Sequence, residues 1–212
     1  SDENVYYVYL GGKGYYYTHY VYESSANAAD DTGHGTETLP YRTISYAVSQ
    51  AGENAIIRVI PGTYSQANNG ESFPITLQTG QRLIGDPAQL GKGGTITTID
   101  CNNDGSGGIT ASSSCFIMGA GSSVQGFDFV NSTGALYVFA IFASGYDFDA
   151  SFNTFENSMY GAVYSNGGGF TSRSNNIYTT DFGYYIMDSS SVDVDIYENS
   201  FGDTMYIPIN IE

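Results

Sequence analysis

Short runs of Val, Ile, Phe and Tyr, separated by clusters of Gly, Asn, Asp and Ser, occur along most of the chain. Such alternation bounded by turn residues predicts strands, and helical periodicity is almost absent. One short helix is expected over residues 41–51, where apolar residues recur at spacings of three and four between Pro40 and Gly52. Strands are expected at residues 55–60, 63–64, 75–77, 82–84 and 95–100. The pattern therefore predicts an all-β chain with one N-terminal helix.

An internal repeat organises the C-terminal half of the chain. Four aromatic residues, each followed by a polar turn, align with spacings of 26, 23 and 23 residues: Phe129, Phe155, Tyr178 and Phe201. A second apolar run follows each turn, at residues 137–141, 161–164, 184–187 and 206–209. A strand-based period in the low twenties is typical of a solenoid whose turns stack around one core.

Two solenoid classes have repeats of this length. Leucine-rich repeats need Leu at fixed offsets, and this chain is poor in Leu. A single parallel β-helix with turns of about 23 residues fits better. Its interior would take Phe, Ile, Val, Met and Tyr, while Asn, Ser and Gly would occupy the corners, where left-handed backbone and side-chain amide hydrogen bonds are needed.

Several motifs in the N-terminal half resemble a known family. They are Tyr20-Val21, Asp30-Asp31-Thr32-Gly33, the stretch from Leu39 to Ala47, the stretch from Ile57 to Tyr64, and Val124-Gln125-Gly126-Phe127. They are similar to a domain of unknown function that forms the N-terminal part of many right-handed parallel β-helices of the pectate-lyase-like superfamily. The resemblance spans residues 20–130. It implies a right-handed β-helix and leaves the activity open, because this fold hosts lyases, hydrolases, adhesins and scaffolds.

Charge excludes several kinds of partner. The 212 residues include 22 Asp plus Glu against 6 Lys plus Arg, for a formal net charge of -16. The basic residues are scattered and form no stripe that could neutralise phosphates, so nucleic acid is not expected as a partner. No apolar run approaches the ~20 residues that cross a bilayer, so membrane insertion is not expected. The lysine-poor, Tyr- and Gly-rich composition favours an extracellular or cell-surface location.

Candidate catalytic groups are few. Lyases of this architecture need convergent bases beside carboxylates, and Arg173 is the only base after Lys92. His34 lies in a Gly-His-Gly sequence without the partner motifs of polygalacturonases, and His19 is expected on the surface of a strand. Two alternating carboxylate pairs are candidate calcium ligands: Asp147 with Asp149, and Asp193 with Asp195. A solvated strand face explains these pairs better, so the sequence favours a non-enzymatic protein without a cofactor.

Two covalent features are candidates for an extracellular chain. Cys101 and Cys115 lack the further ligands of a zinc site, which leaves a disulfide or two buried thiols, and the composition favours the disulfide. Asn131, in Asn131-Ser132-Thr133, is the one candidate acceptor for an N-linked glycan.

Residues 1–17 form a Tyr-rich extension to the β-helix domain of residues 18–212. The strand expected over residues 4–10 is apolar on both faces, before a break at Gly11 to Gly14. It either folds back as a local hairpin or pairs as an added strand with a neighbouring subunit. The apolar C-terminal run has no capping helix and is the expected acceptor. The predicted interface comprises Val5, Tyr6, Tyr7, Val8, Tyr9, Leu10, Tyr206, Ile207, Ile209 and Ile211.

These observations predict a secreted structural subunit that associates with itself, head to tail, into a filament or surface fibre. The alternative is a β-helix that binds or processes polysaccharide, with exposed Tyr rows for sugar and Asp clusters for calcium.

Overall fold

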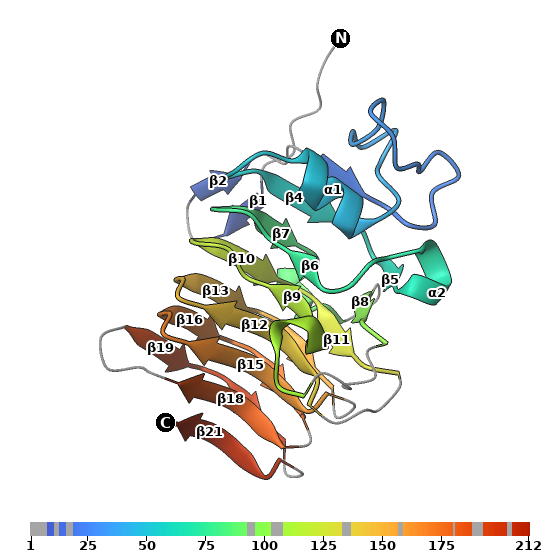
Figure 1. Cartoon of the computed structure of the whole chain (residues 1–212). Coiled ribbons are helices and arrows are strands. Elements are labelled where there is room, and N and C mark those ends of the chain that lie inside the picture. The colour runs from blue at the N-terminus through green and yellow to red at the C-terminus, as the bar shows by residue number, and fades with distance from the viewer. Residues whose placement is uncertain are drawn as a thin grey trace.

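The computed structural model of the chain (Figure 1) describes residues 8–10, 13–15, 19–92, 96–102, 108–132, 137–156, 159–179, 181–187, 193–202 and 205–212.

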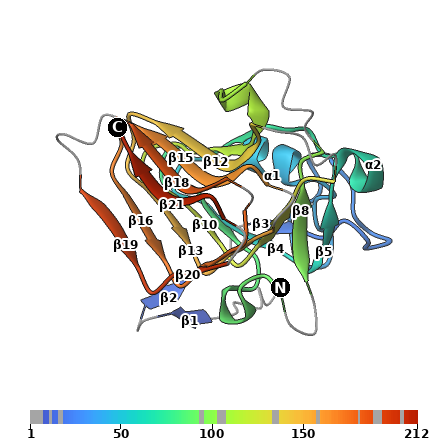
Figure 2. The same ribbon diagram turned by 90° about the horizontal axis from the view of Figure 1, so that it is seen from below.

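Three parallel sheets wind around one core and make the chain a parallel β-helix (Figure 2). Sheet 1 contains β3 (His19–Val21), β4 (Ile56–Val59), β7 (Arg82–Ile84), β10 (Ser122–Gln125), β13 (Phe148–Ser151), β16 (Phe170–Arg173) and β19 (Val194–Tyr197). Sheet 2 contains β5 (Gly62–Tyr64), β8 (Thr97–Asp100), β11 (Asp128–Val130), β14 (Thr154–Phe155), β17 (Asn176–Ile177) and β20 (Ser200–Phe201). Sheet 3 contains β6 (Ile75–Thr76), β9 (Ser114–Ile117), β12 (Phe139–Ser144), β15 (Gly161–Asn166), β18 (Phe182–Met187) and β21 (Ile207–Ile211). The predicted all-β solenoid is confirmed.

The core is built from columns of inward-pointing side chains in register between turns. In sheet 2 one column consists of Tyr64, Ile99, Phe129, Phe155, Ile177 and Phe201. The sequence alignment of the repeat was wrong by one residue in its third turn, because Ile177 and not Tyr178 pairs with Phe155. Ile177 is fully buried, whereas Tyr178 is 37% exposed. A one-residue shift on a strand turns the side chain to the other face, so burial of Ile177 places Tyr178 outside.

Asparagines stack at the corner between sheets 1 and 2. The backbone N–H of Asn153 donates to Oδ1 of Asn175 (2.8 Å), and the backbone N–H of Asn175 donates to Oδ1 of Asn199 (2.9 Å). The residue before each asparagine has a positive φ, at Phe152, Ser174 and Glu198. These corners confirm the expectation that side-chain amides and left-handed backbone turn the chain.

Helix α1 (Ile44–Gln50) covers the N-terminal end of the core and buries Ile44, Ala47 and Val48. Figure 1 shows it at one end of the stack, with β21 at the other. It begins after Thr43, whose side chain accepts from the backbone N–H of Tyr46. The helix is shorter than the expected 41–51. The sequence pattern missed the one-turn helix α2 (Gln66–Asn69) and the 3-10 turns η1 (Pro87–Gln89) and η2 (Ala111–Ser113).

The N-terminal extension contains a local hairpin. Strand β1 (Val8–Leu10) pairs antiparallel with β2 (Lys13–Tyr15) in a two-stranded sheet separate from the three solenoid sheets. This backbone corresponds to the fold-back alternative. The expected break at residues 11–14 was too long, because Lys13 and Gly14 pair with Leu10 and Tyr9. Val5, Tyr6 and Tyr7 lie outside the described residues.

Candidate functional site

In the last turn that the structure describes, core positions lie uncovered by any described residue. One column of sheet 3 consists of Phe116, Ile141, Val163, Tyr184 and Ile209, which are opposite one another on successive strands. The first four are fully buried, whereas Ile209 is 42% exposed. Because Ile209 has the same inward direction as its predecessors, its exposure comes from the absence of a further layer against it in the described structure.

The same feature recurs around the last turn. Ile211 follows the buried Ile186 in register and is 64% exposed. Tyr206, directly before β21, is 78% exposed and adds an apolar ring at this end. Phe201 and Ile196 continue the columns of sheets 2 and 1 and are only half-buried. We refer to Ile196, Phe201, Tyr206, Ile209 and Ile211 as the terminal-turn surface. Of the sequence-predicted interface, Tyr206, Ile209 and Ile211 belong to this surface, and Ile207 is half-buried beside it.

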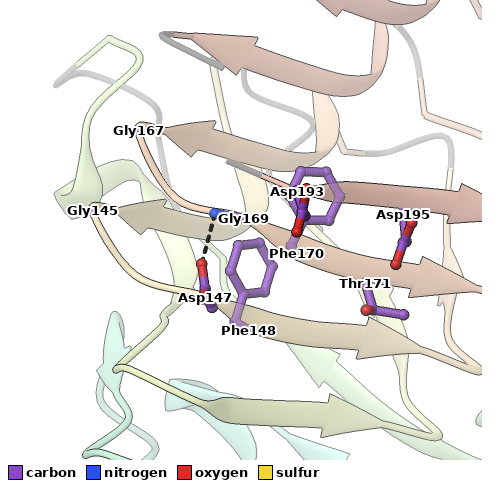
Figure 3. Close-up of a pocket in the computed structure, with 9 residues that line it drawn as sticks. All are labelled: Gly145, Asp147, Phe148, Gly167, Gly169, Phe170, Thr171, Asp193 and Asp195. Carbon is purple, nitrogen blue, oxygen red and sulfur yellow. Dashed lines mark hydrogen bonds between the residues drawn. The ribbon is translucent and has the colours of Figure 1, made fainter. Parts of the chain in front are cut away.

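A pocket of about 520 Å³ lies where sheet 3 turns into sheet 1 over the last three turns (Figure 3). Its polar side chains are Asp147, Thr171, Asp193 and Asp195. The Oδ1 of Asp147 accepts a hydrogen bond from the backbone N–H of Gly169 (3.0 Å). A Cβ on Gly169 would collide with that carboxylate and with the carbonyl of Asp193, so glycine allows these groups to approach. The pocket can accept hydrogen bonds from hydroxyl groups.

The aromatic residues of this pocket are not available as a sugar platform. Phe148 and Phe170 stack on each other with ring centroids 5.1 Å apart and are almost completely buried. On sheet 3 the rings of Phe142, Tyr164 and Tyr185 also stack face to face along the solenoid. Because neighbouring rings cover these faces, the stacks stabilise the turns and leave little aromatic face for a ligand.

The outer face of sheet 1 brings together charges that sequence spacing did not connect. Arg82 and Asp149 lie in one outward column, two strands apart, and Arg173 is on the strand after Asp149. Burial raises the pKa of the Asp149 carboxyl, while hydrogen bonds from Ser151 and Gln125 and the charges of Arg173 and Arg82 act against this. The half-buried Asp149 carboxylate thus lies within the electrostatic influence of two guanidinium groups. Only the strand register could have revealed it.

Asp149 and Asp147, paired by the sequence as calcium ligands, have different surroundings. Asp147 is at the corner in the pocket, whereas Asp149 lies on the sheet beside Gln125. Within the described ranges, no group of three or more His, Cys, Asp or Glu is arranged to hold a metal ion.

The histidines serve local structure. Nδ1 of His34 is 2.5 Å from Oδ1 of Asp31, in a turn that Gly35 continues at φ 107°. His19 was expected on the surface, but it is half-buried and stacks on Tyr41 with ring centroids 5.9 Å apart. His19 is half-buried because the chain at Tyr41 runs beside β3, where Tyr41 forms a β-bridge with Val21.

The two covalent candidates differ in their surroundings. Cys101 and Cys115 are joined by a disulfide, with Cα atoms 5.3 Å apart. Asn131 is completely buried, so the folded chain leaves no space for a glycan on its amide. The corner position predicted for Asn131 is therefore an interior one, and we do not retain it as an acceptor.

The helices in the described part of the chain are all too short or too polar to cross a bilayer.

The stacked parallel turns, the asparagine corner and the helix over one end define a β-helix protein of the single-solenoid class. The chain belongs to the family described as "Protein of unknown function (DUF1565)", whose model matches residues 27–199. This agrees with the resemblance of the N-terminal motifs. No curated protein and no solved structure gave a match to the chain.

Proposed function

We propose that this chain is a non-enzymatic structural subunit and that its terminal-turn surface is covered by a second copy of the same chain. The observation that supports the proposal is the exposure of Ile209 and Ile211 at inward positions, where the preceding turns are closed. Exposed apolar side chains on β21, an edge strand paired only with β18 in the described structure, favour association, because burial removes them from water and pairs the second edge.

A second copy could cover this surface because it presents the same three edge strands, β19, β20 and β21, one from each sheet. An interface made by one patch on both partners is two-fold symmetric. Since α1 covers the N-terminal end of the core, the proposed contact is between the terminal-turn surfaces of two copies. It is therefore not a head-to-tail contact. Growth into a filament or surface layer then needs a second contact, which we assign to residues 1–10.

The test compares oligomeric state by size-exclusion chromatography with light scattering. Wild-type chain is expected to shift from monomer to dimer or larger with rising concentration, and Ile209→Lys is expected to remain monomeric. Ile96→Lys is the matched control, because Ile96 has a similar exposure of 45% and lies far from the last turn in sequence. Wild-type chain that stays monomeric, or equal association of both variants, contradicts the proposal.

The second contact is tested separately by electron microscopy of chain lacking residues 1–10. We expect this chain to fold and pair but to form no long assemblies. Filaments of unchanged length after the deletion would contradict the role of the extension.

Polysaccharide binding is the second candidate, and the pocket of Figure 3 favours it. Its carboxylates and Thr171 suit sugar hydroxyl groups, with or without calcium. Calorimetric titration with neutral and uronic oligosaccharides tests this function. Binding that Asp193→Asn and Asp195→Asn both abolish would support it, and the absence of heat with every oligosaccharide would count against it.

A further inference from the structure

Lys92, Asp128 and Glu156 meet on the outer face of sheet 2. Nζ of Lys92 contacts Oε1 of Glu156 and lies 3.9 Å from Oδ1 of Asp128. Asp128 belongs to β11, and Glu156 directly follows β14, the neighbouring strand. Amine, buried carboxyl and second carboxylate are thus held by three consecutive turns of the solenoid.

The segment before Lys92 is fixed against the sheet. Gly91 has φ +77°, and a Cβ there would overlap the backbone of Phe127 and Asp128. The carbonyl of Leu90 accepts a hydrogen bond from Oγ1 of Thr154 (3.0 Å). This close approach of the backbone to β11 brings the Lys92 side chain to Asp128.

Asp128 is unusual for a residue on an outer sheet face. It is 8% exposed, and its Oδ1 has no hydrogen-bond partner although the atom is buried. Burial raises the pKa of Asp128 to about 6, the charge of Glu156 acts in the same direction, and Lys92 acts against it. A buried carboxylate without a hydrogen bond on one oxygen is costly, so the neutral acid is populated at higher pH than in an exposed aspartate.

We propose that Nζ of Lys92 and Cγ of Asp128 are joined by an amide bond that the folded chain forms by itself, with Glu156 as the proton acceptor. A neutral amine and a neutral carboxylic acid are the reactive forms. The contact with Lys92 places Glu156 where it can take the first proton from the ammonium group.

The atoms and charges of the reaction balance within these three residues. Glu156 takes a proton from Nζ, and the free amine then attacks Cγ of Asp128. The Asp128 hydroxyl leaves as water with a proton returned by Glu156, while the nitrogen gives its next proton to the same carboxylate. The products are the amide, one water molecule and a neutral Glu156, so the Lys92 and Glu156 charges disappear together.

Proximity supplies the driving force that free amines and acids lack in water. Groups held in a near-attack arrangement by a fixed backbone react with very high effective concentrations, on the order of 10⁵ M or more. Burial alone would lower the pKa of Lys92, but the hydrogen bond with Glu156 and the charges of Asp128 and Glu156 raise it overall. The Lys92 ammonium group therefore needs the Glu156 carboxylate as an acceptor for its proton, which makes Glu156 essential to the step.

The bond has a mechanical consequence. It would tie the segment at η1 to the central strand β11 and close a covalent loop from residue 92 to residue 128. Cys101 and Cys115, joined by the disulfide, both lie inside this loop.

The direct test is the intact mass of the full chain after reduction and alkylation of the cysteines. We expect a mass lower than that of the sequence by one water molecule. Protease digestion and tandem mass spectrometry should then give a branched peptide joining Lys92 to Asp128. Lys13 and Lys92 are the only two lysines, so the assignment is unambiguous.

Three variants complete the test. Lys92→Arg keeps the positive charge and should have the full mass, whereas the matched control Lys13→Arg should keep the deficit of one water. Glu156→Gln should have the full mass because the proton acceptor is lost; a retained deficit would overturn the role of Glu156. Because only the folded chain forms the bond, circular dichroism of each variant must match that of the wild-type chain before its mass is compared. Wild-type chain of full mass, or a branched peptide through Glu156, would overturn the Lys92–Asp128 bond.

Discussion

At the scale of single residues, buried amides determine how the chain turns its corners. Nδ2 of Asn175 donates to the carbonyl of Ala150 (2.9 Å), while its Oδ1 accepts from the backbone N–H of Asn153. Nδ2 of Asn153 donates to the carbonyl of Val124 (3.0 Å) one turn earlier. Each amide thus bonds an N–H and a carbonyl of the turn before its own, groups that the corner geometry would otherwise leave without these partners.

Replacing Asn175 by alanine should lower the free energy of unfolding by about 2 kcal/mol, because it leaves the buried backbone N–H of Asn153 unpaired and removes one of the two donors to the carbonyl of Ala150. Urea denaturation followed by circular dichroism measures this change. The neighbouring Asn176→Ala is the control, since Asn176 points to the outer face of sheet 2 in register with Thr154. A loss for Asn175→Ala no larger than that of the control would contradict the structural role of the ladder.

His19 should make stability depend on pH. Burial lowers the pKa of His19 below 6.5, so the folded chain binds this proton more weakly than the unfolded chain does. The free energy of unfolding should therefore fall as the pH decreases below 6.5, with a smaller fall for His19→Gln. Urea denaturation at about pH 7.5 and about pH 5.5 measures the difference. An equal fall in both proteins would show that His19 does not contribute.

At the scale of secondary-structure elements, helix α1 depends on a residue far from it in sequence. Glu71 is 1% exposed, and its carboxylate accepts from the backbone N–H groups of Ile44 (2.7 Å) and Ser45 (2.8 Å). These donors belong to the first turn of α1, where helices lack internal partners and favour negative charge. Burial raises the pKa of Glu71, and the hydrogen bonds to Ser45 and Ile44 act against the rise.

We expect Glu71→Ala to destabilise the chain by about 3 kcal/mol, because the buried N–H of Ile44 and the half-buried N–H of Ser45 lose their acceptor. The exposed Glu53→Ala should change the free energy of unfolding by at most about 0.5 kcal/mol. Thermal or urea unfolding of both variants measures the difference. Equal stability of the two would mean that Glu71 does not fix α1 over the core.

The repeat allowed the sequence to predict most elements but not their register. Turn lengths vary, so the aligned aromatics predicted Tyr178 where Ile177 is buried. The hydrophobic pattern could not distinguish these two adjacent residues, because only packing between turns determines which one faces inward. The Lys92–Asp128–Glu156 cluster was not predictable for the same reason, since its members meet only through the register of β11 and β14 and through the path of the segment after η1.

At the scale of the whole molecule, an apolar end is combined with a strong negative charge. The sequence predicted both properties, since the apolar C-terminal run and the net charge of -16 can be identified from the sequence alone. It did not predict that the N-terminal end is covered by α1, because only the three-dimensional arrangement shows which end the helix covers.

Self-association should strengthen with salt. Like charges on two copies repel at low ionic strength, whereas burial of the terminal-turn surface is apolar and depends less on screening. We expect the dissociation constant from sedimentation equilibrium to fall when sodium chloride rises from about 0.05 M to about 0.5 M. A dissociation constant that rises with salt would indicate that ion pairs, and not apolar contacts, hold the copies together.

Hydrogen–deuterium exchange of β21 as a function of protein concentration tests the central claim most directly. If a second copy covers the terminal-turn surface, amides of residues 207–211 should exchange more slowly as the concentration increases, while those of the interior strands β7 and β10 remain unchanged. Exchange of β21 that is fast and the same at every concentration would contradict the proposal.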